Sequence, residues 1–342
     1  MNLAELNRIA NAMVAKGKGI LAADESTGTI KKRFDAIGVA NVEDNRRDYR
    51  ELMFRTNEAM TKYISGVILF DETIRQKAKD GTPLVELIAK AGAVPGIKVD
   101  AGAKPLVGCP GETVTEGLDG LRERLQEYHK LGARFAKWRA VIDIAGAGVP
   151  SYTCIATNAH ALARYAALCQ ENGIVPIVEP EVLMDGNHDI DRCAEVTEWT
   201  LKEVFRELYY QRVALEGMVL KPNMAIAGKK CAKQAGVQEV AEKTLQVLKR
   251  CVPAAVPGIA FLSGGQSDED ATAHLNAMNA MGPLPWPLTF SYGRALQAAP
   301  QKAWSGKAEN VGKAQAAFTH RARMNGLAAT GEWKAALEKD AA

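Results

Sequence analysis

The sequence predicts an α/β protein whose single domain, residues 1–342, is a (β/α)8 barrel. Eight short apolar segments alternate with polar or glycine-rich loops and helical stretches, a pattern typical of parallel βαβ units. Successive segments start about thirty to forty-five residues apart, which leaves room for a crossover helix between neighbours. No Pro/Gly/Ser-rich linker or change of composition marks a second domain, so eight such units favour one closed barrel over an open sheet.

The elements follow in chain order from their apolar patterns. Apolar residues at helical spacing between Leu3 and Val14 predict an extra N-terminal helix over residues 3–16. Its polar face is not strongly basic, which favours core packing over a membrane surface. The predicted strands are residues 19–24, 64–70, 95–99, 133–139, 174–181, 217–222, 258–264 and 287–293. The predicted helices include residues 119–131, 158–171, 189–211 and 237–250, with a helical C-terminal extension over about 305–342.

Composition and charge exclude several classes of protein. The 24% of charged residues nearly cancel to a net charge of +3, too little for a bulk electrostatic grip on nucleic acid or a membrane. Six scattered cysteines without a CxxC pair are typical of reduced thiols. The N-terminus lacks the pattern of a signal peptide, and no apolar run reaches transmembrane length. We therefore expect a cytoplasmic protein with neither nucleic acid nor membrane as a partner.

Seven of the eight predicted strands end in reactive side chains, and in such barrels catalytic groups lie at the carboxyl ends of the strands. Residues two apart point to the same face of a strand. Lys137 and Arg139 have this spacing on the fourth predicted strand, and Glu179 and Glu181 have it on the fifth. A single charged residue at a strand end is more often simply solvated, but reactive residues at seven strand ends favour a functional site. In chain order these residues are Asp24, Glu25, Ser26, Lys98, Asp100, Lys137, Arg139, Glu179, Glu181, Lys221, Ser263, Ser291 and Arg294.

Lys221 is the candidate nucleophile. It closes a short apolar run, and Pro222 ends the strand because proline cannot donate to a ladder. Burial disfavours the ammonium form of a lysine and leaves a neutral amine that attacks carbonyl groups. Taken alone, a lysine whose charge reaches water from a strand end is the commoner case. Lys137, Glu179 and Glu181 at neighbouring strand ends favour the nucleophile.

The last two strands predict an anion site. Ser263, Gly264 and Gly265 form a turn whose backbone N–H groups can face a phosphate, and glycine allows close approach. Ser291 and Arg294 follow on the eighth strand, and a guanidinium takes phosphate oxygens bidentately. Loops after strands seven and eight are the usual phosphate site of this fold.

Two further observations limit the possible reactions: a second set of cationic residues, and the absence of metal-binding and nucleotide-binding motifs from the sequence. Lys98 and Arg139, with Ser26, can hold another phosphate at the far end of a substrate. The five histidines are dispersed without HxH or HExxH spacing, so we expect no metal site. Neither a dinucleotide GxGxxG after a strand nor a GxxxxGK[ST] motif is present, so we expect no cofactor.

The assembled motifs resemble those of one family. They are GKGILAADESTGTIKKR, GVILFDET, GIKVD, FAKWR, NGIVPIVEPE, LEGMVLKPNM, FLSGGQS and LTFSYGRALQ, from about residue 17 to residue 304. The chain resembles the class I fructose-1,6-bisphosphate aldolases, which form a Schiff base. The resemblance implies a metal-independent, homotetrameric lyase of glycolysis and gluconeogenesis. Its reaction would be the reversible cleavage of fructose 1,6-bisphosphate to dihydroxyacetone phosphate and glyceraldehyde 3-phosphate.

The resemblance also implies roles for five residues. Lys221 would condense with the C2 ketone of the sugar to form the imine. Glu179 would be the acid/base of carbinolamine dehydration, and Asp24 would take the proton of the C4 hydroxyl. Lys137 would stabilise charge near C4 and favour the neutral amine of Lys221. Glu181 would hydrogen-bond the two lysines and hold them in place.

Two further sets are implied to bind the phosphates of the substrate. The C1-phosphate set is Ser263, Gly264, Gly265, Ser291 and Arg294. The set for the other phosphate is Ser26, Thr29, Arg33, Arg46, Lys98 and Arg139. Thr29 stands where many relatives carry serine, which keeps the hydroxyl.

One departure from the family concerns the C-terminus. Animal members carry a longer mobile tail ending in tyrosine, which is implicated in proton transfer to the enamine and in preference for the bisphosphate. The last tyrosine of this sequence is Tyr292. We expect another group to return the proton, or that step to be slow, and weaker discrimination between fructose 1,6-bisphosphate and fructose 1-phosphate than in tailed relatives.

Two alternatives stay open. A transaldolase-like Schiff-base lyase would act on monophosphates and need one anion site, so Arg294→Ala and Arg139→Ala would not both impair it. A binding or scaffold protein would use the barrel as an inert body. The intact set of acid, base and nucleophile argues against this second alternative, and Lys221→Met tests it.

Overall fold

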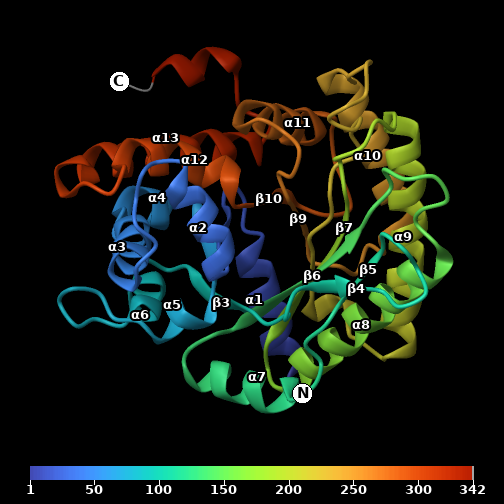
Figure 1. Cartoon of the computed structure of the whole chain (residues 1–342), viewed down its shortest axis with the longest axis horizontal. Helices are drawn as coiled ribbons and strands as arrows, with labels where there is room; N and C mark the ends of the chain where they lie inside the picture. Colours follow the sequence, from blue (N-terminus) through green and yellow to red (C-terminus); the bar gives the residue numbers. More distant parts are fainter. Residues whose placement is uncertain (341–342) are drawn as a thin grey trace.

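In the computed structural model, which describes residues 1–340, eight parallel strands form a closed barrel surrounded by helices (Figure 1). The order around the barrel is β1-β10-β9-β8-β7-β6-β3-β2, and β1 pairs with β2 to close it. The (β/α)8 prediction is confirmed. The strands are β1 (Gly19–Ala23), β2 (Ile64–Leu69), β3 (Val94–Lys98), β6 (Phe135–Ile142), β7 (Val175–Val182), β8 (Val219–Leu220), β9 (Ile259–Phe261) and β10 (Leu288–Tyr292).

The helices confirm the predicted crossovers and add several. The N-terminal helix α1 (Leu3–Met13) and the predicted α7 (Leu121–Lys130), α8 (Tyr152–Glu171), α9 (Ile190–Tyr210) and α10 (Val237–Cys251) are present. Helix α8 starts six residues before the prediction because the Ser151 hydroxyl caps it, accepting a hydrogen bond from Cys154 N at 3.1 Å. The other helices are α2 (Thr27–Asp35), α3 (Glu43–Phe54), α4 (Asn57–Lys62), α5 (Asp71–Arg75), α6 (Leu84–Lys90), α11 (Asp268–Ala280), α12 (Arg294–Trp304) and α13 (Val311–Ala328).

Short elements lie outside this scheme. Strands β4 (Ala103–Pro105) and β5 (Thr113–Thr115) form an antiparallel pair in the loop after β3. Three 3₁₀ turns complete the description: η1 (Leu215–Gly217), η2 (Ala308–Asn310) and η3 (Ala335–Asp340). The C-terminal extension is thus helical as predicted, and α13 packs against α11 and α12. That it belongs to one domain with the barrel stays a prediction.

Helix α1 closes the amino end of the barrel. In Figure 1 it lies within the ring of strands, and its apolar face is fully buried. Leu6, Ile9 and Met13 join one apolar cluster with residues near the starts of the strands, among them Phe135 and Val175. Burial of each such side chain contributes about 1.5–3 kcal/mol relative to its exposure. This floor of the barrel is therefore dry and apolar.

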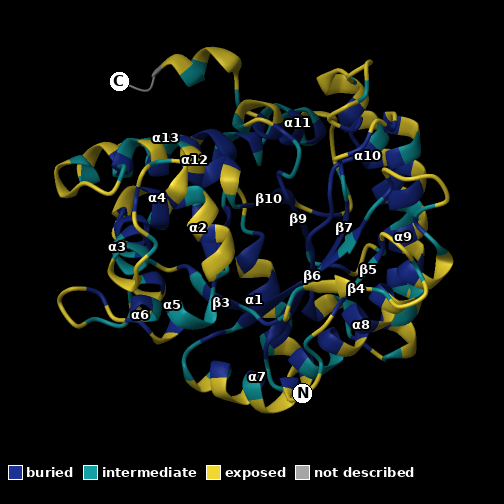
Figure 2. Ribbon diagram, in the orientation of Figure 1, coloured by how far each residue is buried: buried dark blue, intermediate teal, exposed yellow. Residues whose placement is uncertain are grey.

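The interior changes character toward the carboxyl end. Along β6, Phe135 lies in the apolar floor and Lys137 in the layer above it, while Trp138 points outward onto Tyr165 of α8, with ring centroids 5.5 Å apart. On β3, a Cβ at Gly96 would come within 2.3 Å of the Phe135 ring, so glycine there makes room for that ring. Figure 2 shows these buried strands inside helices whose outer faces are exposed. None of the helices in residues 1–340 is both long and apolar enough to cross a membrane.

Candidate active site

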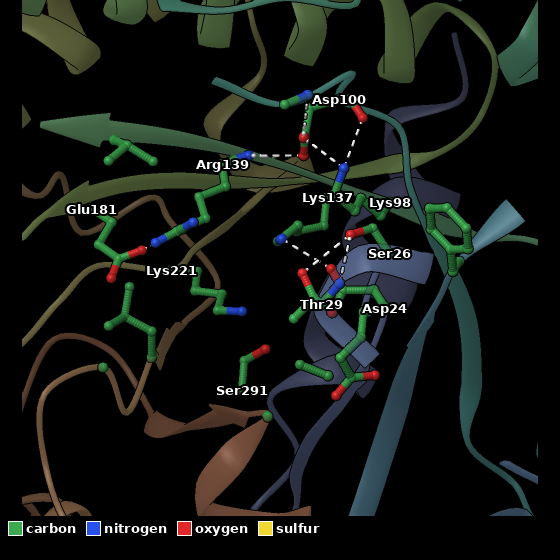
Figure 3. Close-up of a pocket in the computed structure, with 18 of the residues that line it drawn as sticks. Asp24, Ser26, Thr29, Lys98, Asp100, Lys137, Arg139, Glu181, Lys221 and Ser291 are labelled. Carbon is green, nitrogen blue, oxygen red and sulfur yellow. Dashed lines mark hydrogen bonds and ion pairs between the residues drawn. The ribbon is translucent and has the colours of Figure 1, made fainter. Parts of the chain in front are cut away.

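A cavity of about 680 Å³ opens at the carboxyl ends of the strands (Figure 3). All but three of the predicted site residues line it; the exceptions are Glu179, Gly265 and Arg46. The charged side chains around it are six cations and four carboxylates, so the cavity carries an excess of positive charge suited to an anionic ligand. These are Arg33, Lys98, Lys137, Arg139, Lys221 and Arg294, with Asp24, Glu25, Asp100 and Glu181.

Lys221 lies directly after β8, with its side chain in the cavity. The residue is only 4% exposed, and its backbone N–H donates to Val178 O at 2.8 Å, which fixes the end of the strand on β7. Its Nζ lies 3.2 Å from Glu179 Oε1. A buried amine beside a carboxylate has a partner that can take a proton from it.

Glu179 bridges the two buried lysines from below the cavity. Its Oε1 lies 3.2 Å from Lys221 Nζ, and its Oε2 lies 3.3 Å from Lys137 Nζ. Within residues 1–340, Oε2 has no hydrogen-bond partner, so the contact with Lys137 is an ion pair without good hydrogen-bond geometry. One carboxylate thus contacts both cations at the base of the site.

Glu181 does not have the partners that the family resemblance implied. Instead of hydrogen-bonding the two lysines, it accepts a hydrogen bond from Arg139 Nε. The reason is the stagger of parallel strands. Arg139 pairs in register with Glu179, but its side chain extends to Glu181, the next residue of β7 that points inward. Lys137, in register with Ile177, likewise reaches Glu179. In this geometry Glu179, rather than Glu181, contacts both lysines.

Asp24 and Lys137 form a buried ion pair at 2.9 Å. Burial alone would raise the pKa of Asp24, but Lys137 and then Lys221 outweigh it and lower that pKa to about 2. For Lys137, burial acts to lower the pKa, and the carboxylates of Asp24 and Glu179 raise it above its usual range. Both groups are charged at neutral pH, so a fixed cation stands among the carboxylates of the site.

The loop from β1 into α2 forms one wall of the cavity. Ser26 caps α2: its Oγ accepts from Thr29 N at 3.4 Å and lies 3.1 Å from Thr29 Oγ1. Lys98 on β3 donates to Asp100 Oδ1 at 2.7 Å. Arg33 donates to Glu25. Hydroxyls and cations therefore meet on this side as predicted, with carboxylates holding the cations.

Arg46 is a correction to the predicted set. It does not line the cavity, because Glu72 holds its guanidinium with contacts of 2.8 Å from Nε and 2.6 Å from Nη2. A bidentate pair of this kind fixes a planar guanidinium in one direction. Arg46 therefore serves the packing of α3 against α5 rather than the cavity.

The turn after β9 and the start of α12 form a second part of the wall, which adjoins the first because β10 pairs with β1. Arg294 opens α12 and donates to Ser263 O at 3.3 Å and to Gln266 O. Ser291 is buried, lines the cavity, and its Oγ has no hydrogen-bond partner in the described part of the chain. A buried unpaired hydroxyl facing a cavity is suited to a polar ligand. Gly264 lines the cavity beside them.

Gly265 has a different reason to be glycine. It adopts φ +77°, and a Cβ there would lie 2.0 Å from Met184 Cγ. The residue is therefore required by the left-handed turn and by close packing, and it lies behind Gly264 rather than in the wall.

Sequence interpretation missed a buried network beneath Asp24. Glu25 accepts hydrogen bonds from Arg50 Nη2 at 2.7 Å and from Gln297 Nε2 at 2.8 Å, in addition to Arg33. Arg50 also donates to Ala23 O at 3.1 Å. The available signal was Arg50 itself, a charge three and four residues before the apolar Met53 and Phe54 and so on the same face of α3. This network fixes the end of β1, from which Asp24 projects.

Asp100 was among the predicted strand-end residues but was given no role in the site. Its Oδ1 accepts from Lys98 Nζ and from Gly102 N, the latter at 3.1 Å, and it lines the cavity. Its position two residues after Lys98 was a usable signal, because such residues share a face of an extended chain. In the described range 1–340, no group of three or more His, Cys, Asp or Glu side chains is placed to hold a metal ion.

Fold and site together define a class, the (β/α)8-barrel proteins with a buried lysine beside carboxylates and two cationic walls at the mouth. The family model for class-I fructose-bisphosphate aldolase matches residues 5–342. The chain belongs to this family.

Relatives match over nearly their whole length. A probable class 1 fructose-bisphosphate aldolase of Xanthomonas campestris is 62% identical, covering 98% of this chain and all of that protein. A cytosolic fructose-bisphosphate aldolase of Arabidopsis thaliana is 56% identical, covering 99% and 94%. Among solved structures, the aldolase of Plasmodium falciparum, in complex with TRAP and a small-molecule inhibitor, superposes with a TM-score of 0.95. It is 52% identical and covers 97% of this chain and 96% of its own.

Proposed function

We propose that this chain catalyses the reversible cleavage of fructose 1,6-bisphosphate into dihydroxyacetone phosphate and glyceraldehyde 3-phosphate through an imine on Lys221. The observation that carries the proposal is the buried Lys221 amine, 3.2 Å from Glu179 and next to the charged pair of Lys137 and Asp24. Family membership supports the same substrate and reaction.

Imine formation uses Lys221 and Glu179. The neutral amine adds to the C2 carbonyl of the open-chain sugar and gives a carbinolamine. Glu179, which has taken a proton from the Lys221 ammonium group to free the amine, gives that proton to the C2 hydroxyl. The hydroxyl leaves as water, and the products are an iminium ion and the Glu179 carboxylate. The 3.2 Å contact between Glu179 Oε1 and Lys221 Nζ supports this transfer.

Carbon–carbon cleavage uses Asp24. The C4 hydroxyl gives its proton to the Asp24 carboxylate while the electrons of the C3–C4 bond move into the iminium ion. This step releases glyceraldehyde 3-phosphate and leaves an enamine on Lys221, which takes a proton at C3 before hydrolysis frees dihydroxyacetone phosphate. Burial would raise the pKa of Asp24, but Lys137 and Lys221 outweigh it and lower that pKa to about 2. A substrate hydroxyl inserted between Asp24 and Lys137 weakens that stabilisation and makes the carboxylate more basic.

The two walls suit two phosphates. Arg294, Ser291 and Gly264 would take the C1 phosphate, whereas Lys98, Arg139 and the Ser26 hydroxyl would take the other. Arg139 now pairs with Glu181, and a phosphate dianion offers it a stronger charge-assisted bond. Two separate cationic walls support a bisphosphate over the monophosphate of a transaldolase-like lyase.

Assembly, compartment and metal independence belong to the same proposal. The family resemblance supports a homotetramer, which light scattering after size-exclusion chromatography tests. A relative named cytosolic supports a cytoplasmic location. Metal independence predicts full activity in the presence of a chelator, and loss of activity on chelation would contradict it.

Borohydride trapping tests the proposal directly. The full chain is incubated with dihydroxyacetone phosphate, reduced with borohydride, and mapped by peptide mass spectrometry. We expect one stable adduct, on Lys221. An adduct on another lysine, or none while the chain cleaves the sugar, would contradict the assignment of the nucleophile.

A further inference from the structure

The strand that carries Lys221 has the weakest attachment in the barrel. β8 is two residues long, the shortest strand of the barrel, and pairs with β7 through two residue pairs and with β9 through one. By contrast, β6 and β7 pair over eight residues, which sets Lys137 and Glu179 firmly relative to each other. Lys221 lies just beyond the short ladder, so its position relative to Glu179 needs another constraint.

Two prolines interrupt the backbone ladder at this point. Pro180 follows Glu179 on β7, and Pro222 follows Lys221 at the end of β8. Neither ring nitrogen carries a hydrogen to donate. The last backbone bond from β8 to β7 is Lys221 N to Val178 O, because Pro180 removes the next donor of β7 beside the 3.2 Å contact of amine and carboxylate. Pro222 faces β9 instead, where its carbonyl accepts from Leu262 N at 3.1 Å.

The side chain of Asn223 continues the connection. Asn223 is 2% exposed, and its Oδ1 accepts a hydrogen bond from the backbone N–H of Val182, the last residue of β7, at 3.0 Å. Its Nδ2 donates to Thr197 Oγ1 on α9 at 3.0 Å and to Met224 O at 3.1 Å. A fully bonded buried amide of this kind holds its neighbours in one arrangement. The same amide thus ties the end of β8 to the end of β7 and to α9.

We propose that Asn223 is a positioning residue for the imine chemistry. Its side-chain amide connects the two strand ends beyond the point where Pro180 removes a ladder donor, and so sets the distance between Lys221 Nζ and Glu179. Asn223 lies outside the cavity and touches no substrate; it acts through the strand ends on either side. The inference rests on the proposed function, because it gives this distance a role in proton transfer during imine formation. A misplacement of about 1 Å costs such a step on the order of 100-fold.

The experiment separates imine formation from substrate binding. The rate constant for the borohydride-trappable adduct with dihydroxyacetone phosphate is measured in single turnover for wild type and Asn223→Ala. Binding is measured with a hexitol 1,6-bisphosphate, which has both phosphates but no carbonyl. We expect Asn223→Ala to slow adduct formation about tenfold or more and to leave the binding constant within about twofold.

Thr244→Val is the matched control. Thr244 is also buried, and its Oγ1 accepts a hydrogen bond from Ala225 N at 2.9 Å. Ala225 lies two residues further along the chain from Lys221 than Asn223 does. Loss of the Thr244 hydroxyl lowers the melting temperature but leaves the bond between Asn223 and Val182 intact, so we expect adduct formation at the wild-type rate. Asn223→Ser is a second test should alanine impair folding, because its shorter side chain cannot span the 3.0 Å contact; the same slowing is expected.

Three results would overturn the inference. They are a wild-type adduct rate in folded Asn223→Ala or Asn223→Ser, equal slowing in Thr244→Val, and loss of hexitol bisphosphate binding together with the rate. Failure of the proposed function looks different, because then the wild-type chain itself gives no adduct on Lys221.

Discussion

The two ends of the barrel interior are built by the same strands and yet differ completely in chemistry. At the amino end, Leu6 and Met13 of α1 pack with Phe135 and its neighbours in an apolar floor. At the carboxyl end, two residues further along β6, Lys137 contacts Asp24 and Glu179. The floor excludes water below the charged layer, and low polarity strengthens every interaction between those charges. The comparison indicates a division of labour in which stability comes from the floor and chemistry from the mouth.

The largest expected effect is at the mouth, from Lys221→Met. Loss of the amine removes the covalent intermediate, so we expect kcat to fall by a factor on the order of 10³ or more. Activity is measured by coupled assay of glyceraldehyde 3-phosphate release. Lys229→Met is the control, since Lys229 is a surface lysine paired with Asp185 at 2.8 Å. Substantial turnover by Lys221→Met would end the imine mechanism and favour a different site.

The matching change in the floor is Leu6→Ala. Leu6 is fully buried, so the cavity left behind lowers the free energy of unfolding by about 2–5 kcal/mol. Leu3→Ala on the same helix is the control, because Leu3 is 39% exposed, and its effect stays within about 0.5 kcal/mol. Urea denaturation measures both. The value of kcat/KM, measured where both variants are folded, is expected to stay within about twofold of wild type. A tenfold drop would show that floor and mouth are coupled.

The two walls of the mouth are compared by Arg294→Ala and Arg139→Ala. Each loses charge-assisted hydrogen bonds to a phosphate, so kcat/KM for fructose 1,6-bisphosphate falls about 10- to 100-fold in both. With fructose 1-phosphate, only Arg294→Ala should show the full loss. Arg46→Ala is the control, since Glu72 holds Arg46 away from the cavity. A normal bisphosphate reaction in Arg139→Ala would instead favour the monophosphate alternative.

The smallest expected effect is the pH dependence of the Asp24–Lys137 pair. The folded pKa of Asp24 is about 2, below the ordinary value of 3.8, because Lys137 and Lys221 outweigh the burial that would raise it. This contribution is fully present above about pH 4 and is lost as the pH falls through about 2; it amounts to about 2 kcal/mol. Denaturant unfolding of wild type and Asp24→Asn between pH 6 and pH 2.5 measures it. The stability gap between the two should shrink as the pH falls, and a constant gap would contradict the assignment.

Much of the fold could be predicted because parallel barrel strands are buried on both faces and appear as apolar runs. The runs at β1 and β7, for example, are recognisable without any partner. The pair β4–β5 was missed because each strand has three residues and β4 is fully exposed, so neither carries such a run. β8 is shorter than predicted because Gly217 belongs to the turn η1 at its start and Pro222 cannot donate to a ladder at its end.

By itself, the sequence determined which residues share a strand face, since the period of two pairs Lys137 with Arg139 on β6 and Glu179 with Glu181 on β7. Only the tertiary structure decided which of them are partners. The stagger between parallel strands moves each cation one inward position along, so Glu179, rather than Glu181, contacts both lysines. The hydrogen bond from Val182 to Asn223 likewise joins residues 41 apart, and closing the barrel is what brings them together. Local periodicity is encoded in neighbouring residues, whereas stagger and closure depend on the whole ring of strands.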